Sequence, residues 1–163
     1  MKTLFLLRHA KSSWKDKTLT DFERPLNSRG RKAAETMSAF FKQEKVSPDL
    51  ILSSCALRAR ETVEIIVRSA RLRSDLRFDE RIYEASVNRL LEVITQIEKS
   101  ARSALIAGHN PGLEELLSAL TMQSETMPTA ALAKITFKTS NWNNAVKGGA
   151  LEWVVRPKEW ERA

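Results

Sequence analysis

The chain has 163 residues, a length that corresponds to one domain able to bury most of the surface that its unfolded form exposes. Its hydrophobic fraction of 42% and charged fraction of 29% are those of a globular protein and exclude a disordered or fibrous chain. The formal charge of +7 favours anionic partners without choosing among nucleic acid, acidic protein surfaces and phosphorylated small molecules.

The length of the apolar runs and the single cysteine predict the cellular compartment of the protein. No apolar run reaches the length of a membrane span, so we expect no membrane partner. Residues 4–7 are apolar but lead directly into Arg8 and His9 rather than into a small-residue cleavage site, so we expect no signal peptide. Cys55 cannot form an internal disulfide bond, which suits a reducing compartment. These features together predict a cytoplasmic protein.

Strand-like and helix-like segments alternate along most of the chain. Short buried runs, typical of strands covered on both faces, occur at 3–7, 49–53 and 104–107, and residues 76–78 are a weaker strand signal. Helical spacing of apolar residues, or a helix signal at a strand's exit, occurs at 29–45, 54–67, 87–98 and 113–120. Ser28, Ser86 and Asn110 are the expected helix caps, and Pro111 is expected at the first helical position. Segments 131–137 and 150–155 predict two antiparallel strands at one edge.

This alternation predicts an α/β fold in one domain, residues 1–163. We expect a three-layer α/β/α sandwich with a mostly parallel central sheet and an antiparallel edge strand. In open sheets of this kind, ligands bind in the crevice beyond the carboxyl ends of the strands. The polar residues that follow buried strands are therefore the first candidates for a functional site.

Both histidines of the chain, His9 and His109, directly follow buried strands, and Arg8 and Arg58 accompany the same strand ends. Parallel strands bring these ends together. Two imidazoles and two guanidiniums suit an anion such as phosphate, and no acidic or thiolate cluster has metal-ligand spacing, so we expect neither metal nor other cofactor. The arginine-rich stretch 68–81 lacks interleaved aromatic residues for base stacking, so we interpret it as a solvated face and expect no nucleic-acid partner.

The stretches around these strand ends resemble the signature of the histidine phosphatase, or phosphoglycerate mutase-like, superfamily, which has an Arg-His pair after its first strand. The further matches are Arg24-Pro25-Leu26-Asn27 with Arg29-Gly30, Ser53-Ser54 through Arg58-Ala59-Arg60-Glu61-Thr62, and Gly108-His109-Asn110-Pro111-Gly112. Larger members usually have Gly in place of Ala10, and Asn in place of Lys15 or Asp16. These departures favour the SixA-like branch of small phosphohistidine phosphatases over a mutase, which would need a lid to exclude water.

The resemblance implies a role for each of the four central residues. His9 would be the nucleophile that accepts the phosphoryl group, Arg8 and Arg58 would grip its oxygens, and His109 would complete the phosphate pocket. The physical chemistry agrees, because phosphoryl transfer depends mainly on positioning and on neutralising the equatorial oxygens. Two neighbouring cations also disfavour a protonated imidazole, which keeps His9 nucleophilic. His109, if protonated when phosphate is bound, would donate a further charge-assisted hydrogen bond.

For three other residues, both a functional and a structural interpretation remain open. Glu80 best matches the superfamily's proton donor, but it is equally well explained as a surface carboxylate paired with Arg81. Ser13 can donate to substrate phosphate or stabilise a turn. Asn110 can contact the ligand or cap the following helix.

We therefore predict a metal-independent phosphatase that forms a covalent phosphohistidine intermediate. The expected substrate is a phosphohistidine on a protein, such as a phosphotransfer domain or phosphocarrier, with inorganic phosphate or a similar oxyanion bound in the site. Phosphatase action on small esters such as sugar phosphates or nucleotides is the alternative within enzymes. A non-catalytic phosphate- or nucleic-acid-binding module is the alternative from another class, and such a module would not need a nucleophile at His9.

Overall fold

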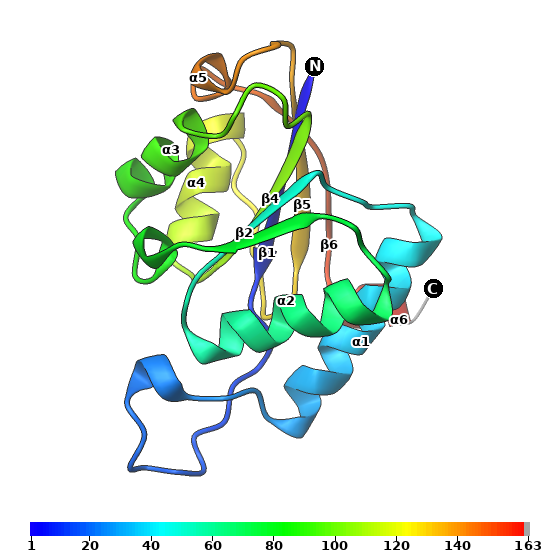
Figure 1. Cartoon of the computed structure of the whole chain (residues 1–163), viewed down its shortest axis with the longest axis vertical. Coiled ribbons are helices and arrows are strands. Elements are labelled where there is room, and N and C mark those ends of the chain that lie inside the picture. Colours follow the sequence, from blue (N-terminus) through cyan, green and yellow to red (C-terminus); the bar gives the residue numbers. More distant parts are fainter. Residues whose placement is uncertain (162–163) are drawn as a thin grey trace.

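A six-stranded sheet in the order β3-β2-β4-β1-β5-β6 forms the centre of the computed structural model, which describes residues 1–161 (Figure 1). The strands are β1 (Lys2–Arg8), β2 (Leu50–Ser53), β3 (Asp75–Phe78), β4 (Ser103–Gly108), β5 (Leu132–Phe137) and β6 (Ala150–Val155). Strands β1 to β4 pair in parallel, whereas β5 runs antiparallel to both β1 and β6. The predicted α/β fold, with antiparallel pairing at one edge, is confirmed.

Helices cover both faces of the sheet and complete the three layers. The α-helices are α1 (Ser28–Gln43), α2 (Leu57–Ser69), α3 (Val87–Thr95), α4 (Gly112–Thr121), α5 (Trp142–Ala145) and α6 (Pro157–Glu161). Helices α3 and α4 lie on one face, with α5 nearby, and α1, α2 and α6 lie on the other (Figure 1). Within residues 1–161, no helix is both long enough and apolar enough to span a membrane.

The ends of the helices differ from the prediction in small ways. Asn27, not Ser28, caps α1, and its side chain accepts a hydrogen bond from the backbone of Gly30. Ser86 caps α3 as predicted, but that helix ends at Thr95 rather than near residue 98. Pro111 occupies the cap position of α4, one residue before the helix begins. Helices α5 and α6, and the short 3-10 helices η1 (Asp21–Glu23) and η2 (Glu80–Ile82), were not predicted.

Strand β1 joins the two halves of the hydrophobic core. Its side chains alternate between the two faces, so Leu4 and Leu6 pack with α3 and α4, while Phe5 and Leu7 pack against α1 and α2. All four are almost fully buried, and burying a side chain of this size contributes about 1.5–3 kcal/mol. This packing fixes the strand whose last residues are Arg8 and, just beyond it, His9.

The register of the central strands brings their carboxyl ends level. Arg8 pairs with Gly108 across β1 and β4, and Ser53 pairs with Ala107 across β2 and β4. The pairing continues one residue further, because the His9 amide donates to the Gly108 carbonyl at 3.1 Å. The three loops that follow β1, β2 and β4 therefore begin side by side.

Candidate functional site

The two histidines meet at the ends of β1 and β4. Their ring centroids lie 5.1 Å apart, with the ring planes tilted by 51°. His9 is buried and His109 is half-buried. The predicted convergence of the two imidazoles is therefore present in the structure.

Backbone contacts fix the orientation and the tautomer of His9. Its Nδ1 lies 2.7 Å from the carbonyl oxygen of Ala10. A carbonyl can only accept a hydrogen bond, so Nδ1 carries the proton and Nε2 keeps a free lone pair. The Ala10 amide donates to Thr62 Oγ1, and the same hydroxyl donates to the Arg58 carbonyl in the first turn of α2. Thr62 thus ties the strand end that carries His9 to the helix that carries Arg58.

Both imidazoles are held in the neutral form. Burial, assisted by the nearby guanidiniums of Arg58 and Arg8 and opposed by the hydrogen bond to Ala10, lowers the pKa of His9 to about 4. Burial, together with smaller contributions from His9 and Arg58, lowers the pKa of His109 to about 3. At neutral pH the free site therefore contains a basic, unprotonated Nε2 on His9.

The two arginines are held by oxygen atoms away from the imidazoles. Arg58 is buried, and its Nη1 and Nη2 donate to the backbone oxygen and to Oδ2 of Asp21, at 2.7 and 3.0 Å. Arg8 is half-buried and donates from Nη1 to the Met127 carbonyl at 3.1 Å. Each guanidinium is therefore anchored through its terminal nitrogens.

Three buried nitrogen atoms at this site have no hydrogen-bond partner. Among the described residues, the buried side-chain polar atoms without a partner are Arg8 Nε, Arg58 Nε and His109 Nδ1. A buried donor without a partner costs about 1–3 kcal/mol, so such atoms are rare away from sites that bind a ligand. All three belong to residues predicted to hold an anion.

Ser54 determines which nitrogen of His109 can donate. Its hydroxyl lies 2.7 Å from His109 Nε2 and also accepts a hydrogen bond from the Ala56 amide. When the Ser54 hydroxyl donates its own proton to Nε2, neutral His109 carries its proton on Nδ1. His109 can therefore donate from Nδ1 without becoming an imidazolium, which differs from the protonated form considered from the sequence.

Asp21 links the site residues, and the sequence did not single it out. Its Oδ1 accepts from Arg24 Nη2 at 2.9 Å, and its Oδ2 accepts from Arg58 at 3.0 Å and from the Tyr83 hydroxyl at 2.7 Å. The Tyr83 hydrogen bond, together with Arg24 and Arg58, holds the pKa of this carboxyl far below its ordinary value. The feature of the sequence that could have pointed to Asp21 is its position three residues before Arg24, in a segment that was predicted as a loop.

Tyr83, rather than Glu80, lies against the imidazoles. The Tyr83 ring contacts His109 edge-on, with centroids 5.5 Å apart, and packs against Phe22 on its other side. Glu80 is exposed on η2, close enough to Cys55 to contribute to its raised pKa, and Arg81 pairs with Asp79 instead. The expected Glu80–Arg81 ion pair is therefore not formed among the described residues.

Ser13 and Asn110 both make local structural contacts. Ser13 Oγ accepts from the amide of Lys15, as in a turn. The side-chain nitrogen of Asn110 donates to Glu114 and to the Met127 carbonyl, and its oxygen accepts from the Glu114 amide. The Met127 carbonyl oxygen also accepts the hydrogen bond from Arg8, so Asn110 helps to position that guanidinium.

Arg60 points elsewhere, and no metal cluster is found nearby. The Arg60 guanidinium stacks over the Phe78 ring at 4.1 Å, as expected for a residue outside the anion pocket. Across residues 1–161, no group of three or more His, Cys, Asp or Glu side chains is arranged to hold a metal ion.

Comparison with known proteins defines the family. The family model of the histidine phosphatase superfamily (branch 1) matches residues 4–104, which carry Arg8, His9 and Arg58. The chain belongs to this superfamily. His109 lies just beyond the matched range, but the strand register places it at the same site.

The relatives include proteins from plants and bacteria. An uncharacterized chloroplastic protein of Arabidopsis thaliana is 30% identical over 96% of this chain and 78% of its own length. An uncharacterized protein of Mycobacterium tuberculosis is 30% identical over 91% of this chain and 90% of its own.

Solved structures place the fold beside the SixA proteins. A candidate phosphohistidine phosphatase SixA of Agrobacterium tumefaciens has a TM-score of 0.83 and 28% identity, covering 96% of this chain and 98% of its own. The protein histidine phosphatase SixA in complex with tungstate has a TM-score of 0.84 at 22% identity, with the same coverage. The predicted SixA-like, phosphoglycerate mutase-like fold is confirmed.

The substitution Asp21→Asn should weaken phosphate binding about tenfold, because it loosens Arg58. Losing a charged hydrogen-bond partner costs about 1.5–3 kcal/mol, whereas the repulsion relieved between a carboxylate and an anion about 7 Å away in water is only about 0.6 kcal/mol. Isothermal titration with inorganic phosphate measures the effect. Asp16→Asn, an exposed aspartate in the same loop, is the matched control. Equal affinity in both variants would contradict the role of Asp21.

Both imidazoles should remain neutral from pH 8 down to about pH 5, because their pKa values lie near 4 and 3. An NMR titration resolves the two rings, and His109→Asn assigns them. The unfolded chain binds these protons near pH 6.5, so stability should fall as the pH drops from 6.5 towards 4. A titration midpoint near 6.5 for His9 would contradict the prediction, because burial and the nearby cations would then not lower its pKa.

Proposed function

We propose that the chain is a metal-independent phosphatase that forms a covalent phosphohistidine on His9. The observation that carries the proposal is the set of three unpartnered buried nitrogens, on Arg8, Arg58 and His109, around a histidine with a free Nε2. Membership in the histidine phosphatase superfamily supports it, as does the likeness to a candidate SixA phosphatase. The tungstate bound by another SixA protein is a tetrahedral oxyanion of the kind that this donor set suits.

The reaction has two displacements at phosphorus. Nε2 of His9 attacks the phosphorus atom while the bond to the leaving group breaks, and the leaving group departs with the bonding electron pair. Arg8 and Arg58 balance the negative charge on the equatorial oxygens, and His109 donates from Nδ1. Water then attacks the phosphorus atom of the phosphohistidine, and the P–N bond breaks with its electron pair returning to Nε2. Inorganic phosphate leaves with one proton of the water, and the other proton replaces the one taken up by the first leaving group.

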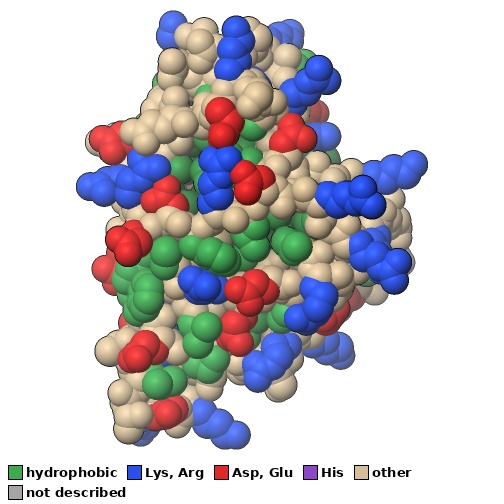
Figure 2. Space-filling view, in the orientation of Figure 1, with side chains coloured by type: hydrophobic (Ala, Val, Ile, Leu, Met, Phe, Trp, Pro, Cys, Tyr) green, Lys and Arg blue, Asp and Glu red, His purple; other side chains and the backbone are tan. Residues whose placement is uncertain are grey.

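We propose a phosphohistidine on a protein as the substrate, delivered by a phosphotransfer domain or phosphocarrier. Large exposed hydrophobic side chains occur on the segments that carry the site: Trp14 stacks on Arg24, Phe22 follows Asp21, and Leu57 precedes Arg58. Figure 2 shows hydrophobic side chains among charged ones over the lower left of the face, the region of the β1–α1 loop and the start of α2. Exposed aromatic residues beside a site suit contact with a protein surface.

The leaving group supports the same choice. Glu80 remains our proposed proton donor, but it is exposed on η2, whereas Tyr83 packs directly against His109. An imidazole, with an ordinary pKa of about 6.5, departs far more readily than an alkoxide. A weakly placed acid therefore disfavours alkyl phosphates more than phosphohistidine.

The variant His9→Ala should abolish turnover of an aryl phosphate, to below about 10⁻³ of the original rate, and should leave phosphate affinity within about threefold. The arginines and His109 remain to bind the anion, whereas the nucleophile is lost. Steady-state hydrolysis and phosphate titration on the same preparation separate the two effects. Retained turnover would remove the covalent mechanism, and a wild-type protein without hydrolysis would indicate a binding module.

The substrate class can be tested by comparing kcat/KM for a phosphohistidine-bearing phosphotransfer domain with that for a panel of sugar phosphates and nucleotides. We expect the phosphoprotein to exceed every ester by at least about a hundredfold, because esters have poorer leaving groups and no protein surface. Trp14→Ala should reduce only the phosphoprotein value. A sugar phosphate or nucleotide with the higher kcat/KM would assign the enzyme to small esters.

A further inference from the structure

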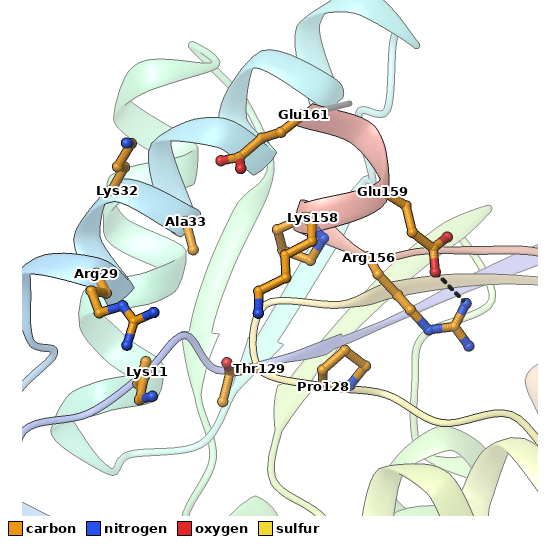
Figure 3. Close-up of a pocket in the computed structure, with 11 residues that line it drawn as sticks. Lys11, Arg29, Lys32, Ala33, Pro128, Thr129, Arg156, Lys158, Glu159 and Glu161 are labelled. Atoms are coloured by element: carbon orange, nitrogen blue, oxygen red, sulfur yellow. Dashed lines mark hydrogen bonds and ion pairs between the residues drawn. The ribbon is translucent and has the colours of Figure 1, made fainter. Parts of the chain in front are cut away.

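A second hollow, in which five of the eleven lining residues are cationic, lies beside the segment that follows His9. It has a volume of about 580 Å³ and is bounded by Lys11, the start of α1, residues 128–129 and α6 (Figure 3). Lys11, Arg29, Lys32 and Lys158 contribute side chains from three parts of the chain. Figure 3 shows Lys158 extending between α6 and the Lys11–Arg29 side of the hollow. None of the four residues predicted to bind phosphate lines it, so it is separate from the site of His9.

These four cations have little opposing charge. The lining contains five cationic and two acidic side chains, and the acids, Glu159 and Glu161, both lie on α6. The ion pairs found among residues 1–161 include Arg156 with Glu159, but none involves Lys11, Arg29, Lys32 or Lys158. Glu161 instead accepts a hydrogen bond from Thr36. Cations therefore outnumber acids in the lining, and Lys11, Arg29, Lys32 and Lys158 have no ion-pair partner among residues 1–161.

The main chain holds two of these cations side by side. The Asn27 amide donates to the Lys11 carbonyl at 3.0 Å, and a Cβ atom on Gly30 would overlap that same carbonyl. Only glycine permits this approach, and it fixes Arg29 next to Lys11. The first turn of α1 contains no acidic residue, so the positive end of the helix dipole adds to the potential of both side chains. Packing thus maintains a concentration of positive charge that by itself is unfavourable.

We propose that this hollow is a second, non-catalytic anion site for a small soluble molecule that carries two or more phosphoryl groups. Its volume lies in the range of about 300–1,000 Å³ that is usual for small-molecule sites. Cations that line a concave surface focus the potential inside it, which suits a compact polyanion better than a broad acidic surface. Several phosphoryl groups are needed because the cations come from three separate segments.

The segments that line the hollow also hold Arg8 and His9 in place. Residues 128–129 line it, and their neighbours hold the catalytic pair: the Met127 carbonyl accepts from Arg8, and the Ala130 amide donates to the carbonyls of Arg8 and His9. Lys11 lies two residues after His9. A polyanion in the hollow would therefore contact two segments next to the nucleophile. One is the segment that follows His9, and the other is the loop of residues 128–129, whose neighbours bind Arg8 and His9.

The experiment uses inorganic tripolyphosphate and the full chain with Arg58→Ala, which weakens the phosphate pocket. Isothermal titration should give one tripolyphosphate bound per chain. Adding Lys11→Gln and Lys158→Gln should weaken this binding by at least about tenfold, which corresponds to about 1.4 kcal/mol. Adding Lys42→Gln and Lys138→Gln instead removes the same charge from exposed positions outside the hollow, and it should change the affinity by less than about twofold.

Equal losses in the two pairs of variants would overturn the proposal, because binding would then follow net charge alone. Tighter pocket-dependent binding of a polyglutamate peptide, or pocket-dependent retention on phosphatidylglycerol vesicles, would overturn the assignment to a soluble phosphorylated molecule. The substituted lysines are exposed, so folding should be unaffected, and the thermal midpoint checks this. The readout is binding in a catalytically weakened variant, so its failure leaves the phosphatase proposal untouched, and the reverse also holds.

Discussion

The hydrogen-bonded ion pair between Arg58 and Asp21 is the interaction on which the geometry of the site most depends. A guanidinium cannot lose its proton inside a protein, so a buried arginine must be compensated by oxygen atoms. Asp21 supplies two of them to Arg58, one from the backbone and one from the side chain, and shares its carboxylate with Arg24. Because these contacts engage only the terminal nitrogens, Arg58 Nε stays available.

Burial, assisted by the same cations, keeps the histidines neutral. An imidazole can stay neutral when it is buried beside cations, whereas an arginine cannot. The cost of burial, and to a lesser extent of gathering positive charge, therefore appears as lowered pKa values for His9 and His109. Hydrogen bonds also bear on the tautomers: the Ala10 carbonyl leaves Nε2 of His9 free, and a proton on Nδ1 of His109 requires the Ser54 hydroxyl to donate to Nε2. His9 then presents a lone pair and His109 presents a proton, although both are neutral imidazoles.

The parts of this arrangement that depend on parallel strands could be predicted from the sequence. His9 and His109 follow buried strands, and strand pairing alone brings such ends together, so their proximity needs no knowledge of the loops. Asp21, Ser54 and Tyr83 act through contacts between loops far apart in the chain, and the periodicity of the sequence contains no information about these. Helix α5 has only four residues, too few for a periodic pattern, and its Trp142 is fixed by a hydrogen bond to the distant Ala101.

The contacts of Tyr83 connect the architecture of the site to the chemistry we propose. Its hydroxyl proton is directed to Asp21, and burial with this carboxylate raises the pKa of Tyr83 to about 12, so it is a poor source of protons. The tyrosine packed against His109 thus provides a ring and a hydroxyl already bound to Asp21 rather than a free carboxylic acid. A site built in this way stabilises the phosphoryl group well and the departing group poorly. In the mechanism that we propose, such a balance would favour substrates whose leaving group needs little help, as a protein imidazole does and a sugar alkoxide does not.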